Sequence, residues 1–439
     1  MSNDRRSRLG ALAATRFGLG ARGDEIARAS ADPIGWLLAQ LEGPGPTPAP
    51  RPATPERLAA AHAVERLPGS GDAAFALHRG MADADLLDRA RHGAETLQPF
   101  RERWALFWAN HFALRVGGPV ELLAGAYVRE AVDPHLTGRF ADLAEAALTH
   151  PAMLAALDQP ESTGPNSPAG RASGRGLNEN LGREILELHT VGRAAAYDQA
   201  DVVEMARLLT GWSYAGGDAD EDARGRFRVD LDRREPGGRI VLGRRYAEGE
   251  ALACVRHLAG RPEAHERVAL KVARHFVADA PAPALVRRLA AALDRSGGSL
   301  PALAEALATA PEAWAGPGKF KRPYEFLVSA HRALGFSPSD TGTVAGFLRA
   351  CGHAPLWADT AAGSSDADAV WATPAGLAHR AHLAQRLGGQ AGAGDSLAAA
   401  AAALGDRLSE RTRRLLGRGD LEPAEATALL LLSPEFLRR

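Results

Sequence analysis

The sequence predicts a mainly α protein, a multi-helix orthogonal bundle with one small β-hairpin insertion. Two observations lead to this fold class. Apolar residues recur three and four positions apart along most of the 439 residues, which is the spacing of an α-helix. Only between Arg224 and Arg245 does the spacing change to two, which is typical of strands. A chain of this length exceeds one small core, so we expect two or three packed parts.

The first part of the chain is predicted to be helical with two interruptions. The first helix covers 23–41, where Ile26, Pro33 and Leu37 belong to an apolar stripe. It is followed by a Pro-rich, semi-rigid linker and then by helices at 55–67, 82–97, 99–112, 120–131 and 140–148. The second interruption is a loop rich in Gly, Pro and Ser at 158–176. We expect this loop to be a lid, mobile or held only by a polar site beneath it.

Two helices and the hairpin are predicted in the middle of the chain. The helices cover 177–190 and 199–211, and Asp198 with Asp201 marks the start of the second one. In the hairpin, the alternating stretch from Phe227 to Leu231 pairs with 240–242 across a turn at 236–238. The helices expected after the hairpin are 248–259, 262–277, 282–294, 300–309, 322–334, 343–351, 374–387, 396–416 and 423–432.

These elements predict five segments. They are an N-terminal helical segment at 1–42, the linker at 43–55, a helical core at 56–212 that contains the loop, the hairpin insertion at 213–247 and a C-terminal helical region at 248–439. The sequence has no fixed-period repeat, which argues against a solenoid.

Charge, cysteine content and hydropathy exclude several classes of protein. The 52 Lys and Arg residues balance 53 Asp and Glu residues, whereas nucleic-acid binders normally have a basic excess. Two cysteines, Cys254 and Cys351, are too few for a disulfide scaffold or a cysteine zinc cluster. No apolar stretch is long enough for a signal peptide or a membrane span. We therefore expect a soluble, cytoplasmic protein that binds no nucleic acid.

Lysine and asparagine are rare, and their positions are informative. The chain has only three lysines, Lys271, Lys319 and Lys321, and five asparagines, among them Asn110 and Asn180. Its heavy use of Ala, Arg, Gly and Pro suggests a GC-rich coding sequence, which disfavours both residue types. The surviving lysines and asparagines mark places where a compact ammonium or a short carboxamide is needed, unless they cluster by chance.

One polar helix follows the long loop. Asn180, Glu184 and Glu187 fall on one stripe beside an apolar stripe. This pattern indicates either a structural network or half of a metal or acid–base site, and Arg183 could simply pair with Glu187. His189 lies about 140° around the helix from Glu184, so both could hold one ion only if the helix distorted near its end.

Histidine and cationic side chains elsewhere complete the set of candidates. His111 shares a helix face with an aromatic stripe, which fits either a core histidine or a ligand or general base. Lys271 and His275 lie four apart on one helix, a face that could hold a carboxylate or phosphate or be a solvated edge. Lys321 and Arg322 precede a helix, where they would form an anion site or a solvated loop.

Several short segments together resemble a known family. They are 14–20, 108–112, 178–192, 197–202, 209–212, 271–276, 320–323 and 433–436. Over essentially its whole length the chain resembles the bacterial family catalogued as domain of unknown function 1800. The resemblance implies a largely helical protein, often encoded beside a companion family that looks like alkaline phosphatases and sulfatases. Many relatives are exported, and this sequence departs from them in having no signal peptide. Its Asn-His-Phe and Glu-Ile-Leu-Glu-Leu-His motifs are intact, so any family site should be intact too.

Two classes of function are open. The first is a metal-dependent enzyme, hydrolytic or redox, in which His111, Glu184 and Glu187 are catalytic. Its metal ligands would be His111, Glu184 and His189, which suit Zn, Fe or Mn, and a haem bound through His111 or His275 is an alternative. The residues expected to bind an anionic substrate are Asn110, Asn180, Lys271, His275, Lys321 and Arg322. The second class is a non-catalytic helical scaffold or accessory protein whose polar motifs tie helices to loops.

The environment of Glu184 separates these two classes. If Glu184 and His111 share a site, Glu184 must be buried and contact His111, Asn110, Lys271 or a metal, because burying an unpaired carboxylate costs several kcal/mol. A solvent-exposed Glu184, or one more than about 10 Å from His111, would favour the scaffold.

Overall fold

The structure is a computed structural model that describes residues 3–43, 45, 50–117, 119–193, 195–392, 396–418 and 420–439. It confirms the predicted fold class, because helices dominate and the strands form two small antiparallel sheets. The helices of the first half are α1 (Asn3–Leu12), α2 (Glu25–Ala31), α3 (Pro33–Leu38), α4 (Thr54–Glu65), α5 (Gly71–Glu95), α6 (Pro99–His111), α7 (Val120–Tyr127), α8 (Phe140–Thr149), α9 (Pro151–Ala156), α10 (Pro168–Ser173), α11 (Asn180–Glu184) and α12 (Gln199–Leu209).

The second half continues the same pattern. Its helices are α13 (Ala251–Ala259), α14 (Pro262–Phe276), α15 (Pro283–Ser296), α16 (Leu300–Thr309), α17 (Pro323–Leu334), α18 (Thr341–Ala350), α19 (Asp368–Trp371), α20 (Pro374–Ala391), α21 (Ser396–Leu404), α22 (Glu410–Leu416) and α23 (Pro423–Leu431). Three short π-helical turns occur at Ala13–Phe17, Val128–Val132 and Ile185–His189. The third of these turns positions a candidate site residue.

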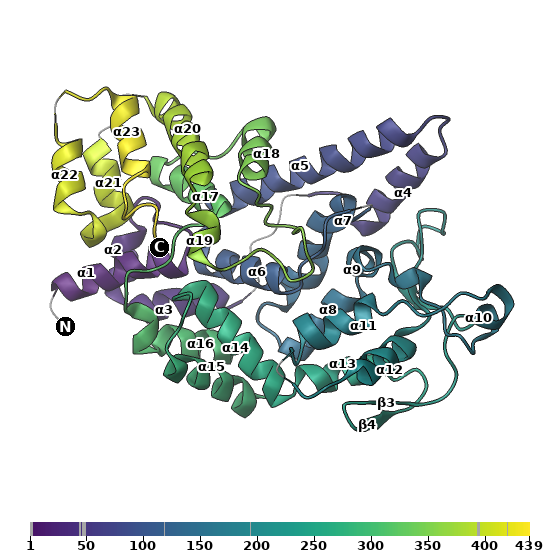
Figure 1. The fold of residues 1–439 in the computed structure, drawn as a ribbon. Helices are drawn as coiled ribbons and strands as arrows, with labels where there is room; N and C mark the ends of the chain where they lie inside the picture. The colour runs from purple at the N-terminus through teal and green to yellow at the C-terminus, as the bar shows by residue number, and fades with distance from the viewer. Residues whose placement is uncertain are drawn as a thin grey trace.

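The first predicted helix is divided at Asp32. The expectation of one helix over 23–41 is wrong, because a proline disfavours the helical conformation of the residue before it. Asp32 instead adopts an extended conformation and caps α3, with its side chain accepting from the backbone N–H of Gly35 at 3.0 Å. Residues 44 and 46–49 of the predicted linker lie outside the described residues. Helix α4 begins at Thr54, and it forms with the long helix α5 a hairpin that projects from the body (Figure 1).

The strands pair differently from the prediction. Strand β2 (Phe227–Val229) pairs with β1 (Trp212–Tyr214), and β3 (Arg239–Val241) pairs with β4 (Arg244–Tyr246). The predicted pairing of 227–231 with 240–242 is therefore wrong. The tight turn lies one strand later, where Leu242 and Gly243 both have positive φ. The insertion thus contains two short hairpins instead of one.

The long loop at 158–176 is anchored to this insertion. The carboxylate of Glu235 accepts from the backbone N–H of Asn166 at 2.8 Å and from its side chain at 2.6 Å. The backbone N–H of Gly164 donates to Arg233 and that of Ala169 donates to Asp232. The loop also contains the short helix α10. The expectation that only a polar site beneath the loop could hold it is wrong, because the strand insertion anchors it as well.

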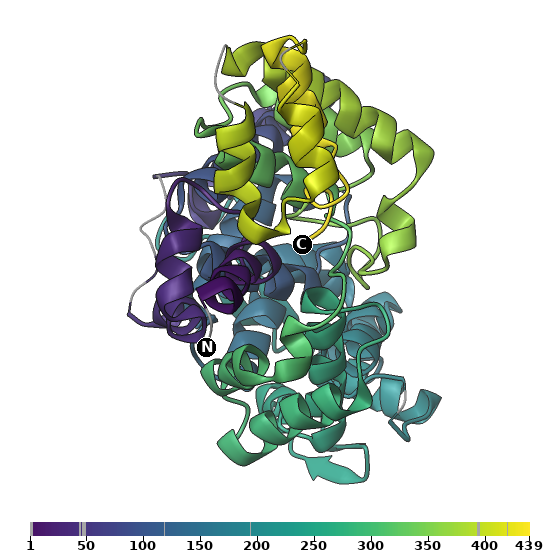
Figure 2. The same cartoon turned by 90° about the vertical axis from the view of Figure 1, so that its left-hand side faces the viewer.

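A continuous hydrophobic core connects the two ends of the chain, with buried members from Ala13 to Phe436. Figures 1 and 2 show α20–α23 at one end of the molecule and α14–α16 at the other, with the N-terminal helices between them. Arg332 on α17 fixes this arrangement, since its buried guanidinium donates to the carbonyl oxygen of Gly20 at 2.8 Å and pairs with Glu25 at 2.7 Å. The division into five segments stays a prediction. No helix in the described part of the chain is long and apolar enough to cross a membrane.

Candidate functional site

Two buried histidines from distant segments bind each other's backbone. His111 ends α6, and His189 ends the π-helical turn that follows α11. Nε2 of His111 donates to the carbonyl oxygen of His189 at 3.1 Å, and Nδ1 of His189 donates to the carbonyl oxygen of His111 at 3.2 Å. Because a carbonyl oxygen only accepts, these bonds assign one proton to each ring. The pair joins two helix ends that are 78 positions apart in the sequence.

The π-helical turn directs His189 into the core. Its wider winding is visible in the backbone bond from Thr190 to the carbonyl oxygen of Ile185, five residues earlier, at 3.0 Å. The hydroxyl of Thr190 donates to the same oxygen at 2.6 Å. The helix therefore distorts near its end, as a shared Glu184–His189 site would have required. The distortion brings His189 to His111, while Glu184 stays half-buried.

Both histidines are neutral at neutral pH. Burial and then the positive charge of Lys271 lower the pKa of His189 to about 3, and the same two causes hold the pKa of His111 well below its usual value. Nδ1 of His111 and Nε2 of His189 are therefore unprotonated. Each is buried and has no hydrogen-bond partner among the described residues. These two unprotonated nitrogens can therefore each accept a hydrogen bond.

Helix α14 places cationic side chains beside this pair. Arg267, Lys271 and His275 follow one another at a spacing of four and so share a helix face. Nε of Arg267 donates to the carbonyl oxygen of Leu188 at 3.1 Å, which binds α14 to the π-helical turn. Lys271 is half-buried and makes no hydrogen bond or ion pair with a described residue. Burial, and then the charge of Arg267, lower the pKa of Lys271 to about 7.

Asp366, which the sequence reasoning missed, completes the cluster. Nδ1 of His275 donates to its carboxylate at 3.0 Å, and the carboxylate also pairs with Arg322. Burial would raise the pKa of Asp366, but Arg322, then His275 and Lys271, outweigh burial and hold that pKa below its usual value. Burial lowers the pKa of His275 to about 4, so the ring is neutral at neutral pH and its Nε2 is unprotonated. This Nε2 is a third buried nitrogen without a hydrogen-bond partner in the described residues. The Ser-Ser-Asp-Ala-Asp run at 364–368 was the signal available in the sequence.

The predicted carboxylates lie apart from this cluster. Glu187 pairs with Arg183 at 3.5 Å, as the sequence allowed, and with Arg193 at 2.8 Å. Glu184 makes no hydrogen bond or ion pair with a described residue, and burial followed by the charge of Glu187 raises its pKa. Asn180 is exposed. The expectation that Glu184 is buried against His111, Asn110 or Lys271 is therefore wrong, because the helix face that carries it borders solvent.

Two other predicted ligand-binding residues hold the fold together. The side chain of Asn110 donates to the carbonyl oxygen of Ser364 at 3.0 Å and accepts from its N–H at 2.7 Å. This clamp fixes the loop that carries Asp366. Lys321 is buried, donates to the hydroxyl of Ser329 at 2.9 Å and lies over the ring of Phe436 at 3.7 Å from its centroid. Both side chains therefore already have partners within the fold.

The family model described as "Protein of unknown function (DUF1800)" matches residues 12–438. The chain belongs to this family. No curated protein and no solved structure matches it. In this DUF1800 chain, the short segments that carried the resemblance supply the histidine pair, Lys271 and His275 of α14, and Arg322. The fold brings those segments together at one cluster, which we name the Lys271 cluster: His111, His189, Arg267, Lys271, His275, Arg322 and Asp366.

The DUF1800 chain does not assemble the predicted metal ligands. No three His, Cys, Asp or Glu side chains in the described residues gather closely enough to hold a metal ion. His111 and His189 each offer one free nitrogen, but Glu184 adds no contact to them. The metal assignment stays a prediction, and we derive no chemical step through a metal. What the Lys271 cluster offers is an amine with a pKa near neutrality beside neutral imidazoles, a combination suited to proton transfer.

Proposed function

We propose that the protein is an enzyme that binds an anionic substrate beside Lys271 and moves a proton with that amine. One observation carries the proposal. Lys271 is a half-buried amine without a partner among the described residues, and its pKa is lowered to about 7. Perturbed pKa values of this kind are concentrated at functional sites, although ion-pair networks also produce them.

The charge balance around Lys271 favours an anion. Arg267 and Lys271 have no carboxylate within ion-pair distance among the described residues, and Asp366 already pairs with Arg322. A carboxylate or phosphate bound beside the amine would compensate this excess of positive charge. The family resemblance leads us to expect a companion that looks like a phosphatase or sulfatase. The inorganic anions that such enzymes release belong to the class that this cluster would bind.

The same amine is suited to acid–base catalysis. A group with a pKa near 7 is present in its charged and neutral forms at once, and general acid–base catalysis is most efficient under that condition. Neutral Lys271 can take a proton from a bound substrate and return it later. His111 and His189 can accept a hydrogen bond through the nitrogens that have no partner. Hydrolysis of an activated anionic substrate is one reaction of this class.

The metal, the haem alternative and the cytoplasmic location predicted from the sequence are each tested by a separate measurement. Elemental analysis of the purified protein tests the metal-dependent enzyme, and its visible absorption spectrum tests the haem alternative. A stoichiometric metal would support a site at His111 and His189, and a haem band would support ligation by His111 or His275. The cytoplasmic location is tested by fractionation of the source cells.

Chemical labelling of the lysines tests the proposed function. Acetic anhydride labels neutral amines, and peptide mass spectrometry distinguishes the three lysines of the chain. We expect labelling of Lys271 to reach half its maximum near pH 7, whereas an ordinary lysine does so at about 10.4. Buried Lys319 and Lys321, each at most 3% exposed, should react only after unfolding and serve as internal controls.

Ligand protection supplies the second half of the test. Inorganic phosphate, acetate and a neutral control, glycerol, are added during labelling at pH 7. An anion that binds beside Lys271 should slow its labelling, because it favours the protonated amine. Labelling that follows an ordinary lysine titration and ignores all three additives would contradict the enzyme and favour the scaffold.

A further inference from the structure

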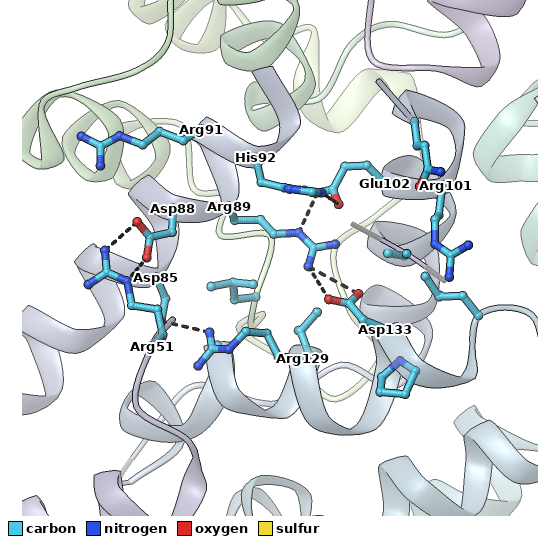
Figure 3. Close-up of a pocket in the computed structure, with 18 of the residues that line it drawn as sticks. Arg51, Asp85, Asp88, Arg89, Arg91, His92, Arg101, Glu102, Arg129 and Asp133 are labelled. Atoms are coloured by element: carbon cyan, nitrogen blue, oxygen red, sulfur yellow. Dashed lines mark hydrogen bonds and ion pairs between the residues drawn. The ribbon is translucent and has the colours of Figure 1, made fainter. Parts of the chain in front are cut away.

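A second candidate site lies in a cavity on the other side of α6. The cavity has a volume of about 760 Å³ and is walled by α5, α6, α7 and the π-helical turn Val128–Val132. None of the residues of the Lys271 cluster lines it. Cavities of this size commonly hold small organic molecules. Figure 3 shows the charged side chains that converge on it.

The walls combine charged and apolar surfaces. Helix α5 contributes residues at the spacing of one helix face, and so does α6. On α5 they include Asp85, Asp88, Arg89 and His92, on α6 they are Arg101, Glu102 and Ala105, and Gln98 directly precedes α6. Val128, Leu136 and Leu356 add apolar wall. A ligand that fills this cavity therefore needs an apolar body as well as a polar group.

Arg89 stands at the centre of the polar wall. Figure 3 shows it between Glu102 and Asp133. Its Nε donates to Glu102 at 2.6 Å and its Nη1 to Asp133 at 3.2 Å. Its Nη2 is buried and has no hydrogen-bond partner in the described part of the chain. A buried donor without an acceptor is unfavourable, so this face of the guanidinium is one where a bound acceptor would be stabilised.

Arg101 is the second donor. It is 8% exposed, and its guanidinium donates to the carbonyl oxygen of Gly43 at 3.3 Å. No carboxylate in the described residues lies within ion-pair distance of it. Beside it, Oε1 of Gln98 is a buried acceptor without a described donor. This corner of the cavity therefore presents free guanidinium donors and one free acceptor.

Most carboxylates of the cavity already have cationic partners, and the exposed Glu95 accepts a hydrogen bond from the hydroxyl of Ser337 instead. Asp85 pairs with Arg57 at 2.7 Å, and Asp88 pairs with Arg51. Glu102 and Asp133 both pair with Arg89. An incoming anion would consequently meet the uncompensated Arg101. It would have to compete with existing ion pairs only at the centre of the cavity, around Arg89. The charge pattern favours binding of an anionic group at the Arg101 corner.

We propose that this cavity binds a small organic anion whose carboxylate or phosphate group lies between Arg101 and Nη2 of Arg89. The apolar body of the ligand would pack against Ala105, Val128 and Leu136. A hydroxyl or amine next to the anionic group would donate to Oε1 of Gln98. The site is separate from the Lys271 cluster, so it stands whether or not the proposed enzymatic function holds.

Isothermal titration calorimetry of the full chain tests the proposal. The probes are octanoate, octyl phosphate, inorganic phosphate and neutral octanol, in low salt at pH 7.5. We expect binding of octanoate or octyl phosphate, and comparison of the two identifies the preferred head group. Inorganic phosphate should bind at least tenfold more weakly and octanol should not bind. Absence of binding by both amphiphilic anions would overturn the proposal.

Variants assign the binding to the cavity. Arg101→Gln should weaken binding at least tenfold, whereas Lys271→Met and a substitution at an exposed position of α13, Arg256→Gln, should not change it. Thr137 lines the cavity, so Thr137→Trp narrows it while Arg101 is kept. This variant should also abolish binding. It tests the location of the site if Arg101→Gln does not fold. Loss of binding in Lys271→Met, or unchanged affinity in both cavity variants, would place the ligand elsewhere and refute the proposal.

Discussion

The substitution Lys271→Met gives a quantitative test of the environment of this amine. Methionine keeps an unbranched side chain of similar length and removes the titrating group. In the folded protein burial lowers the pKa of Lys271 from 10.5 to about 7. Below pH 7 the amine is charged in both states, and the full cost of burying that charge is present. Between pH 7 and pH 10 the unfolded chain holds a proton that the folded chain has released, so this cost disappears as pH rises.

The magnitude follows from the two pKa values. At about 1.36 kcal/mol for each pH unit, their difference sets a ceiling of about 5 kcal/mol on the cost. Lys271 is only half-buried, and water reaches part of the side chain, so we expect about half of that ceiling. Between pH 6 and pH 9 the wild-type protein should therefore gain about 1–2 kcal/mol of unfolding free energy relative to Lys271→Met.

Urea unfolding of both proteins at pH 6, 7.5 and 9 measures this gain. The seven tryptophans supply the fluorescence signal. Other titrating groups are common to both proteins and cancel when the difference in unfolding free energy is compared between pH values. A difference that stays constant from pH 6 to pH 9 would refute the lowered pKa, and with it the reasoning that makes Lys271 a proton-transfer group.

Three further substitutions test the surrounding structure. Glu235→Ala should release the anchored loop, so that trypsin cleaves after exposed Arg171 faster than in the wild type; an unchanged cleavage rate would contradict the anchoring. Asp366→Asn leaves Arg322 buried without its carboxylate, so the free energy of unfolding of the variant in urea should be about 3–5 kcal/mol lower than that of the wild type. A loss under about 1 kcal/mol would count against burial of the pair. Glu25→Gln should cost a similar amount, because its guanidinium partner is fully buried; calorimetry showing an unchanged melting temperature would speak against this.

Local signals predicted most helices of the fold. Asp198 and Asp201 form the expected capping box at the start of α12, with the Asp198 side chain accepting from the Asp201 N–H at 3.0 Å. Pro33 was placed inside a helix because the apolar spacing continued through it, and the local effect of proline on Asp32 was overlooked. Strands β2 and β3 were located correctly but paired wrongly, and their actual partners β1 and β4 were not predicted. Period-two alternation identifies a strand, whereas its partner depends on contacts distant in the sequence.

The candidate site shows where periodicity fails. His111 could be selected because it shares a helix face with an aromatic stripe, and Lys271 and His275 because lysine is rare in this chain and the two lie four positions apart. The helical-wheel argument placed His189 about 140° from Glu184 on a regular α-helix, whereas the chain forms a π-helical turn there that brings His189 to His111. Asp366 lies in a loop, where no periodic pattern indicates which way a side chain points. Backbone irregularity and loop geometry are set by tertiary packing, so neither could be read from local spacing.

The contact of Arg332 with the N-terminal helices also constrains how the chain folds during synthesis. The carbonyl oxygen of Gly20 and the guanidinium of Arg332 are separated by 312 positions. Ribosomes add about 5–20 residues per second, so roughly 15–60 s elapse between the synthesis of the two partners. During that interval the carboxylate of Glu25 and the carbonyl of Gly20 lack their native donor. The first helices to be made are therefore among the last to reach their native contacts, and they are the segment of the nascent chain that a chaperone would have most time to bind.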